Sequence, residues 1–160
     1  MFMFLKCLSI LGISMVPVIE LRGAIPIGVR TLGVNFWLTV AIAVVGNLIP
    51  IPFLIVYGRR VLEYFASFEK FGKPFRWILS LGEKKVAKMK KTLFVALWLF
   101  VAVPLPGTGA WTGALVALTL NLKLRESFPA IALGVVTAGA IVSVVTYIDK
   151  IIAFIQTVFA

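Results

Sequence analysis

The amino-acid sequence predicts an all-α integral membrane protein built from two halves of inverted topology, each a re-entrant helical hairpin followed by one transmembrane helix. Hydrophobic residues make up 61% of the 160 residues and the mean hydropathy is +1.08, far above the values of soluble domains. The charged residues, 14% of the total, gather in clusters separated by long uncharged runs. The lengths of these runs fit either a full membrane span or a shorter re-entrant leg.

The first uncharged run, from Cys7 to Ile19, is only 13 residues long. A hydrocarbon core of ~30 Å needs about 20 helical residues, so this run is too short to cross it. A polar break from Glu20 to Pro26 follows, and then a second apolar leg toward Leu32. We therefore predict a first re-entrant hairpin that folds back within the bilayer.

Two later runs are long enough to cross the membrane. The run from Phe36 to Tyr57 predicts a transmembrane helix that is kinked at Pro50 and Pro52, because proline removes a helical hydrogen bond. The 22 uncharged residues from Ser127 to Ile148 predict a second, regular transmembrane helix. These two spans are the full transmembrane helices of the predicted fold.

The run from Thr92 to Leu122 lies between the two spans and has 31 residues. As one helix it would measure about 46 Å, which is too long for one span and too short for two spans with a turn. Its centre reads VPLPGTGAWTG, and these prolines and glycines interrupt a helix. We predict a second re-entrant hairpin with a buried tip, because irregular backbone at membrane depth must be surrounded by protein or water.

The two halves share the order short leg, break, short leg and full span. Pro17 aligns with Pro104, and Gly46 then falls within one position of Gly134, so an internal duplication is expected. Halves of this kind with opposite topology are typical of secondary transporters, whose sites lie at the midplane where broken helices meet. Four simple transmembrane spans are the alternative architecture.

The chain divides into three parts. Residues 1–58 form the first hairpin and its transmembrane helix, residues 59–91 a basic segment with amphipathic helices, and residues 92–160 the second hairpin, its transmembrane helix and a C-terminal hydrophobic tail. Ten of the sixteen Lys and Arg residues lie in the basic segment. The positive-inside rule therefore places this segment in the cytoplasm and the chain in the inner or plasma membrane as a multi-pass protein.

Composition also excludes several function classes. The formal charge of +10 marks one loop rather than a groove for phosphates, so no nucleic-acid partner is expected. With Cys7 as the one cysteine and no histidine, the chain offers no internal disulfide and no Cys/His metal cluster. We expect no metal, no cofactor and no enzyme, since the sequence has neither a Walker loop nor a nucleophile with an adjacent base.

The first break places two charged side chains at membrane depth. A carboxylate there costs about 2.5 kcal/mol or more and is normally paired, protonated or functional. Glu20 is thus the leading candidate for a proton-coupling or cation-binding acid. Arg22 is its partner or a clasp for an anionic substrate group, because a guanidinium keeps its proton and binds phosphate or carboxylate as a fork. A charge pair that only pins the hairpin to its neighbour is the alternative.

The second break carries no charge but offers hydroxyls, an indole donor and backbone amides. Helix N-termini that begin there favour an anionic or electron-rich group, whereas glycines used only for close packing are the alternative. Asn47 and the two following prolines expose polar groups to the same cavity or form a simple kink. The candidate site residues are Glu20, Arg22, Gly23, Pro26, Asn47, Pro104, Pro106, Gly107, Thr108, Gly109, Trp111 and Thr112.

The motif ELRGAIP (20–26) followed by PLPGTGAWTG (104–113) resembles the paired signatures of the small multidrug export protein family, which is distantly similar to the DedA, or VTT-domain, membrane proteins. The resemblance covers nearly the whole chain. It implies two re-entrant hairpins that face each other and transport of lipid phosphates such as the undecaprenyl carrier. It also marks Glu20 as the hairpin acid and Pro104, Pro106 and Gly107 as the second break. The DedA pattern has arginines in the second hairpin, which this sequence lacks, so Arg22 is the buried substitute.

These observations predict a secondary transporter, proton-coupled, that exports a small amphipathic or charged molecule. A lipid-phosphate flippase or scramblase is the main alternative, and a membrane assembly factor that transports nothing is the third. The expected partners are the lipid bilayer, protons, a small-molecule or lipid-phosphate substrate and a second copy of the chain. A homodimer is expected because two full spans have little surface with which to enclose a cavity.

Overall fold

A computed structural model of the chain describes residues 2–68, 90–105 and 107–159. Throughout these residues the regular elements are helices, which confirms the all-α prediction. Two helical segments, Phe36–Val61 and Leu124–Ile148, are long and apolar enough to cross a membrane, and they coincide with the two predicted spans. The amphipathic helices predicted for the basic segment fall mostly on residues 69–89, which lie outside the described residues.

The first half contains a broken helix pair followed by a long helix. Its elements are α1 (Phe2–Met15), α2 (Glu20–Pro26), the π-helix η1 (Ile27–Thr31), α3 (Phe36–Leu48) and α4 (Pro50–Ala66). The separation of α3 from α4 falls at the predicted proline kink. Helix α4 continues through residues 59–66, which the sequence assigned to the basic segment, because no proline or glycine interrupts it there.

Two polar contacts involve the loop between η1 and α3. Helix α1 begins at Phe2, whereas the sequence predicted a first leg that begins at Cys7. The ammonium of Lys6, within α1, donates a hydrogen bond of 2.6 Å to the carbonyl of Leu32. Helix α3 begins after Asn35, whose side-chain oxygen accepts from the backbone N–H groups of Trp37 and Leu38 at 3.0 and 3.3 Å. This is an N-terminal cap, which fixes the start of the first span.

The second half repeats this order with α6 (Lys90–Ala102), α7 (Ala110–Thr119) and α8 (Leu124–Phe159). The break between α6 and α7 falls on the predicted proline and glycine stretch. The C-terminal tail is not a separate element, since α8 runs through it to Phe159. No helix-breaking residue separates the tail from the span, so the charged pair at 149 and 150 does not end the helix.

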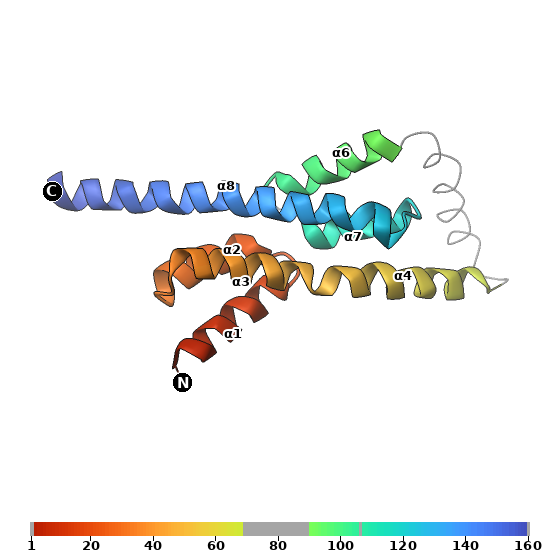
Figure 1. The fold of residues 1–160 in the computed structure, drawn as a ribbon, viewed down its shortest axis with the longest axis horizontal. Coiled ribbons are helices and arrows are strands. Elements are labelled where there is room, and N and C mark those ends of the chain that lie inside the picture. Colours follow the sequence, from red (N-terminus) through yellow and green to blue (C-terminus); the bar gives the residue numbers. More distant parts are fainter. Residues whose placement is uncertain (1, 69–89, 106, 160) are drawn as a thin grey trace.

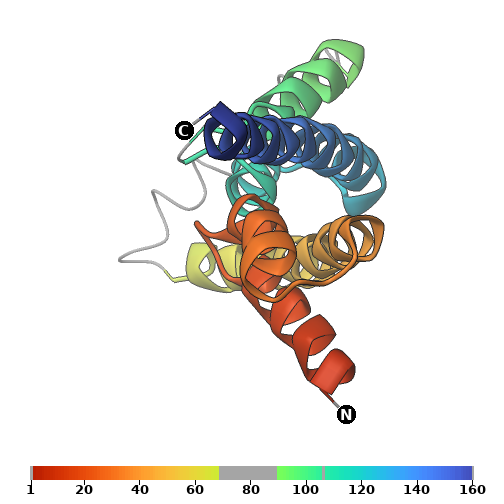
Figure 2. The same cartoon turned by 90° about the vertical axis from the view of Figure 1, so that its left-hand side faces the viewer.

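The two hairpins approach each other from opposite ends of the molecule. In Figure 1, α3–α4 and α8 run antiparallel along the long axis, α1–α2 enters from the end where α3 begins, and α6–α7 enters from the other end. Seen along this axis, α1 and α6 lie at opposite outer edges with α2 and α7 between them (Figure 2). Helices α1 and α6 pack on α3 and α8 of their own halves, whereas α2 contacts α8 and α7 contacts α4. Each second leg thus contacts the long helices of both halves.

Equivalent glycines allow the first legs to approach the long helices closely. A Cβ added at Gly46 would lie 2.9 Å from the carbonyl oxygen of Leu11, and one added at Gly134 would lie 3.0 Å from that of Trp98. The alignment of Gly46 with Gly134 also brings Leu11 onto Trp98 within one position. The two halves therefore repeat a helix-packing contact as well as an order of elements.

The buried core fills the space between the hairpins and the long helices. Its largest fully buried apolar side chains are Ile10, Leu21, Ile25, Ile51, Val101, Ile131 and Val135. Polar side chains are buried in the same region, among them Glu20 and Asn47, which are 4% and 1% exposed. Because burying a polar group is costly unless it is hydrogen-bonded, these two residues indicate where a functional site lies.

Candidate functional site

The carboxyl group of Glu20, at the first break, lies at the start of a helix in the second hairpin. Its Oε1 accepts a hydrogen bond from the backbone N–H of Trp111 at 3.2 Å, and the carboxyl group also accepts from the N–H of Ala110. These N–H groups belong to the first turn of α7, where no carbonyl of the helix itself can receive them. The side chain therefore acts as an N-terminal cap supplied by the other half, and its charge is favourable at this helix end.

The backbone of the first break is strained where it presents this side chain. Val18 and Glu20 have φ angles of +77° and +50°, in the left-handed region that side-chain-bearing residues rarely adopt. Such conformations cost about 1–3 kcal/mol each and persist only where the surrounding structure holds them. The contact of Glu20 with α7 is one interaction that holds this turn.

Arg22 binds the other end of the second break. Its guanidinium donates to the carbonyls of Val103, at 3.3 Å, and of Leu105. It also donates to Thr108 Oγ1 at 3.0 Å. These carbonyls follow the last residue of α6, where the helix leaves acceptors without helical donors and where a positive charge is favourable. Glu20 and Arg22 thus bind opposite helix ends of the same break.

The second hairpin returns one contact to the first. The indole N–H of Trp111 donates to the carbonyl of Met15, the last residue of α1, at 3.2 Å. Within the second break, Thr108 Oγ1 lies 2.6 Å from the carbonyl oxygen of Val103 and 2.8 Å from that of Leu105, and the hydroxyl of Thr112 donates to the carbonyl of Gly109 at 3.2 Å. The two tips are therefore joined in both directions.

Gly109 makes room for the carboxyl group. Its φ angle is +138°, which L side chains rarely adopt, and a Cβ at this position would lie 2.8 Å from Glu20 Cδ. Gly107 has a φ of +85° but open space around its Cα. The first of these glycines is thus required by both conformation and space, and the second by conformation alone.

Asn47 completes the surroundings of Glu20 from the first transmembrane helix. Its side-chain amide N–H donates to the carboxyl group. Its Oδ1 is buried and has no hydrogen-bond partner among the described residues. A buried acceptor without a donor costs roughly 1–3 kcal/mol, so this atom is an unsatisfied position directly beside a titratable group.

A pocket of about 360 Å³ opens beside Arg22. Arg22, Pro26 and Arg30 contribute one wall from α2 and η1, Pro104 contributes from the second break, and Thr146 lies on α8. The first three are spaced by four residues, so a single helix face carries both guanidinium groups to the pocket. The pocket therefore has two cationic side chains, which suit an anionic ligand.

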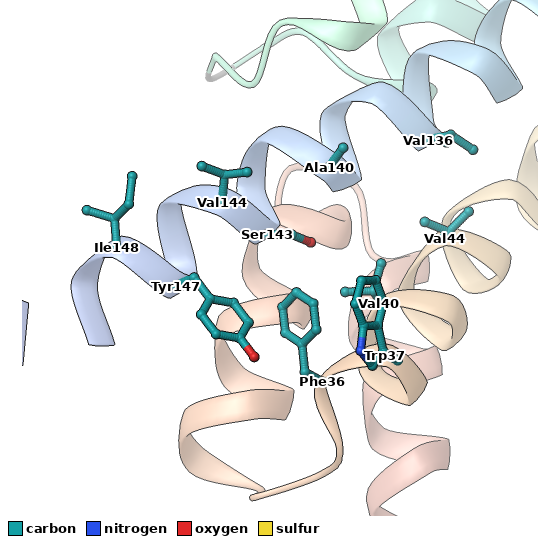
Figure 3. A pocket seen from close by; sticks show the side chains of 10 residues that line it. All are labelled: Phe36, Trp37, Val40, Val44, Val136, Ala140, Ser143, Val144, Tyr147 and Ile148. Atoms are coloured by element: carbon teal, nitrogen blue, oxygen red, sulfur yellow. The ribbon is translucent and has the colours of Figure 1, made fainter. Parts of the chain in front are cut away.

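A second, apolar groove of about 560 Å³ lies between α3 and α8 (Figure 3). The rings of Phe36 and Tyr147 face each other edge to face at its end, with their centroids 4.7 Å apart, and Trp37 lies next to them. Ser143 contributes a hydroxyl to an otherwise largely aliphatic lining. This volume is within the range of sites for small molecules.

The structure brings most of the predicted site residues together around the two breaks. Glu20, Arg22, Asn47, Thr108, Gly109 and Trp111 share the contacts described above, and Pro26 and Pro104 line the adjoining pocket. Gly23 lies in α2, where a Cβ would overlap Ile19 of the preceding turn. Pro106 lies outside the described residues.

Sequence reasoning missed two kinds of participant. Arg30 and Thr146 line the pocket but were not predicted as site residues, although the four-residue spacing of Arg22, Pro26 and Arg30 was a readable signal. The carbonyls of Met15, Val103 and Leu105 were also missed. Backbone groups leave no trace in the residue types, so no sequence signal distinguished them.

Both breaks lie within a segment of the chain that resembles a known protein family. The family model described as "Putative small multi-drug export protein" matches residues 20–141, which is more than half of the chain and includes both breaks. No curated protein matches the chain. No solved structure matches it either.

Proposed function

Because the chain belongs to the small multi-drug export family and has two helices long and apolar enough to cross a membrane, we propose that it is a secondary transporter. It exports a small amphipathic or charged molecule in exchange for protons. Glu20 is the coupling acid in this proposal. Arg22 orients the hairpins and clasps an anionic group of the substrate.

The observation that carries the proposal is the double set of partners around Glu20. In the ionised state the carboxylate accepts from the amides at the start of α7. In the protonated state its O–H can donate to Asn47 Oδ1, a buried acceptor with no donor among the described residues, once the side-chain amide of Asn47 turns this oxygen toward the carboxyl group. A group that must gain and lose a proton during each cycle needs partners in both states, since an unsatisfied buried group raises the energy of one state.

The membrane arrangement belongs to the same proposal. The hairpins are re-entrant and the halves have inverted topology. Residues 59–91 lie in the cytoplasm, because clusters of Lys and Arg favour the cytoplasmic side of a membrane. The meeting point of the breaks then lies near the bilayer midplane, as expected for a transporter with broken helices. A homodimer provides the additional surface that two spans lack.

The apolar groove supports an amphipathic substrate. Aromatic rings line one end of it, and its side-chain polar groups are the hydroxyls of Ser143 and Tyr147 and the indole N–H of Trp37, so it suits an apolar molecule with little polar surface. The guanidinium pocket at Arg22 and Arg30 suits an anionic group. The transported molecule is proposed to use one of these two surfaces.

The decisive experiment is substrate-dependent proton movement in proteoliposomes with a trapped pH-sensitive dye. A pH gradient is imposed, and lipophilic dyes and a polyprenyl phosphate are offered in turn. Wild type is compared with Glu20→Gln, which keeps the size of the side chain and one carbonyl acceptor for the α7 amides but cannot cycle a proton. We expect the variant to lose proton-coupled flux completely while its thermal unfolding temperature stays close to that of the wild type.

Glu126→Gln is the matched control, because Glu126 also accepts a backbone hydrogen bond, from Lys123 at 3.4 Å, but lies at the start of α8 away from the breaks. This control should keep wild-type flux. Equal flux in Glu20→Gln and wild type would rule out Glu20 as the coupling acid.

Lipid-phosphate flipping is the second candidate, and the pair of guanidinium groups in one pocket favours it. A flippase or scramblase of this kind needs no proton gradient. In the same vesicles, gradient-independent transbilayer movement of a fluorescent lipid phosphate that is lost in Arg30→Gln but kept in Glu20→Gln would favour this function over coupled export.

A further inference from the structure

A third pocket, of about 280 Å³, lies far from the two breaks, where α4 passes the start of α8. Its lining has two distinct parts. The apolar part consists of Ile55, Val56, Leu122 and Leu124. The cationic part consists of Arg59, Arg60 and Lys123, the first two from α4 and the third from the turn before α8. Such a pocket is amphipathic, with its positive charge on one side.

The position of this pocket along the first span places it at a membrane boundary. The segment Phe36–Val61 has 26 residues. A helix of that length measures about 39 Å, which exceeds a hydrocarbon core of ~30 Å by roughly two helical turns. With the aromatic residues at the start of α3 at one interface, the hydrocarbon ends near Ile55 at the other. Arg59 and Arg60 then lie about one turn further out, at the level of the lipid headgroups.

The neighbouring charges leave the pocket cationic. Arg60 also lies over the ring of Tyr57, with 5.6 Å from its Cζ to the ring centroid, which orients its guanidinium along the helix surface. Glu126 lies close to this pocket, where its carboxylate accepts from the backbone N–H of Lys123. Arg125, adjacent to it, adds a further positive charge at the same end of α8. The summed charge of these side chains is positive.

From this juxtaposition we propose that the pocket binds the phosphate headgroup of an anionic phospholipid. The apolar part of the lining receives the upper acyl chain, and Arg59, Arg60 and Lys123 bind the phosphate. In the proposed orientation the lipid belongs to the cytoplasmic leaflet, where anionic lipids and basic pockets between helices meet. The lipid joins α4 of the first half to α8 of the second. This site is independent of Glu20, so its test neither supports nor weakens the transport proposal.

The experiment measures lipid retention by the purified full chain in detergent, using native mass spectrometry with phosphatidylglycerol and, separately, phosphatidylcholine. We expect one phosphatidylglycerol to be retained in preference to phosphatidylcholine. Arg60→Gln and Lys123→Gln should each weaken retention about fivefold, the factor expected for one cation near an anionic lipid. Arg125→Gln is the matched control, since Arg125 carries the same charge at the same end of α8 but does not line the pocket, and it should retain the lipid as the wild type does.

A charge-preserving variant separates binding from folding. Arg59→Lys combined with Arg60→Lys keeps both positive charges and should keep most of the retention, which shows that the neutral variants lose a charge and not the fold. Inorganic phosphate is added as a competitor to distinguish a lipid site from a site for the free anion.

Three results would overturn the proposal. If Arg125→Gln weakens retention as much as the pocket variants do, the lipid is held by general charge attraction. If phosphatidylcholine is retained equally, the pocket does not select an anionic lipid. If millimolar phosphate displaces phosphatidylglycerol, the pocket takes the free anion instead of the lipid.

Discussion

The two hairpins share an arrangement but differ in the groups that they bring to their meeting point. The first hairpin supplies charged side chains, Glu20 and Arg22. The second supplies helix ends, namely the amides at the start of α7 and the carbonyls after α6. Their long-helix contacts are nevertheless repeated, with Gly46 and Gly134 at equivalent places. Packing is therefore common to both halves, whereas titratable chemistry belongs to one.

If Glu20 is the coupling acid as proposed, this difference shows how two halves with the same order of elements can carry a single coupling group. Two buried carboxylates facing each other would repel, and one would have to stay protonated. A helix N-terminus opposite a carboxylate instead stabilises the ionised state with fixed dipoles and titrates nothing itself. One half can thus change its charge while the other offers a constant surface. The variants described next test this division.

The largest expected effect is at Gly109. Gly109→Ala forces a Cβ into the carboxyl group of Glu20 and adds strain at a φ of +138°, so we expect a loss of about 3 kcal/mol in the free energy of unfolding. Gly107→Ala carries only the conformational strain and should cost about 1 kcal/mol. Thermal unfolding in detergent compares the two. Equal losses would mean that the carboxyl group does not occupy the place described.

An intermediate effect is expected at the glycines that the two halves share. Gly46→Ala and Gly134→Ala each push a Cβ against a carbonyl of a first leg, and each should cost about 2 kcal/mol. The repetition of the packing predicts similar losses at both positions. Gly12→Ala, where a Cβ would meet no atom within 4 Å, is the control and should not lower the unfolding temperature, because Ala is favoured over Gly inside a helix. A large loss at only one of the shared glycines would contradict the equivalence of the two contacts.

The smallest effect is expected at the tryptophans. Trp111→Phe removes the indole donor to Met15, and Trp98→Phe removes a donor to Thr137 Oγ1 at 3.1 Å within the second half. Each lost hydrogen bond should cost about 1 kcal/mol. Only Trp111→Phe loosens the contact between hairpins, so the proteoliposome flux should change in this variant alone. A parallel change in Trp98→Phe would show that flux follows stability and not the contact between tips.

Local sequence signals predicted the fold well because proline and glycine act on their own segment. The break between α6 and α7 and the interruption between α3 and α4 follow directly from missing amide donors and from backbone freedom. The ends of α4 and α8 were less predictable. Charges at 59, 60, 149 and 150 mark a membrane boundary but do not end a helix, so both helices extend further than the hydrophobic runs.

The candidate site was predictable in its residue types but not in its pairing. Glu20 and Arg22 stood out because charge at membrane depth is costly. Their partners could not be read from the chain, since Arg22 binds backbone carbonyls and Glu20 binds backbone amides, and every residue has these groups. Glu20 and Arg22, two positions apart, suggested one another as partners. Their charges do attract each other, while their hydrogen bonds go to opposite ends of the second break.

The exchange of contacts between the hairpin tips has a consequence for biosynthesis. Glu20 and Trp111 are 91 positions apart. The ribosome therefore releases the first hairpin with its carboxylate and guanidinium long before their partners exist. Bare charged groups are costly in lipid, and in the proposed re-entrant arrangement the first hairpin lies within the bilayer. We therefore expect the insertion machinery to shelter this hairpin until α7 emerges. Truncated nascent chains that end before residue 111 should remain associated with that machinery, and longer chains should leave it.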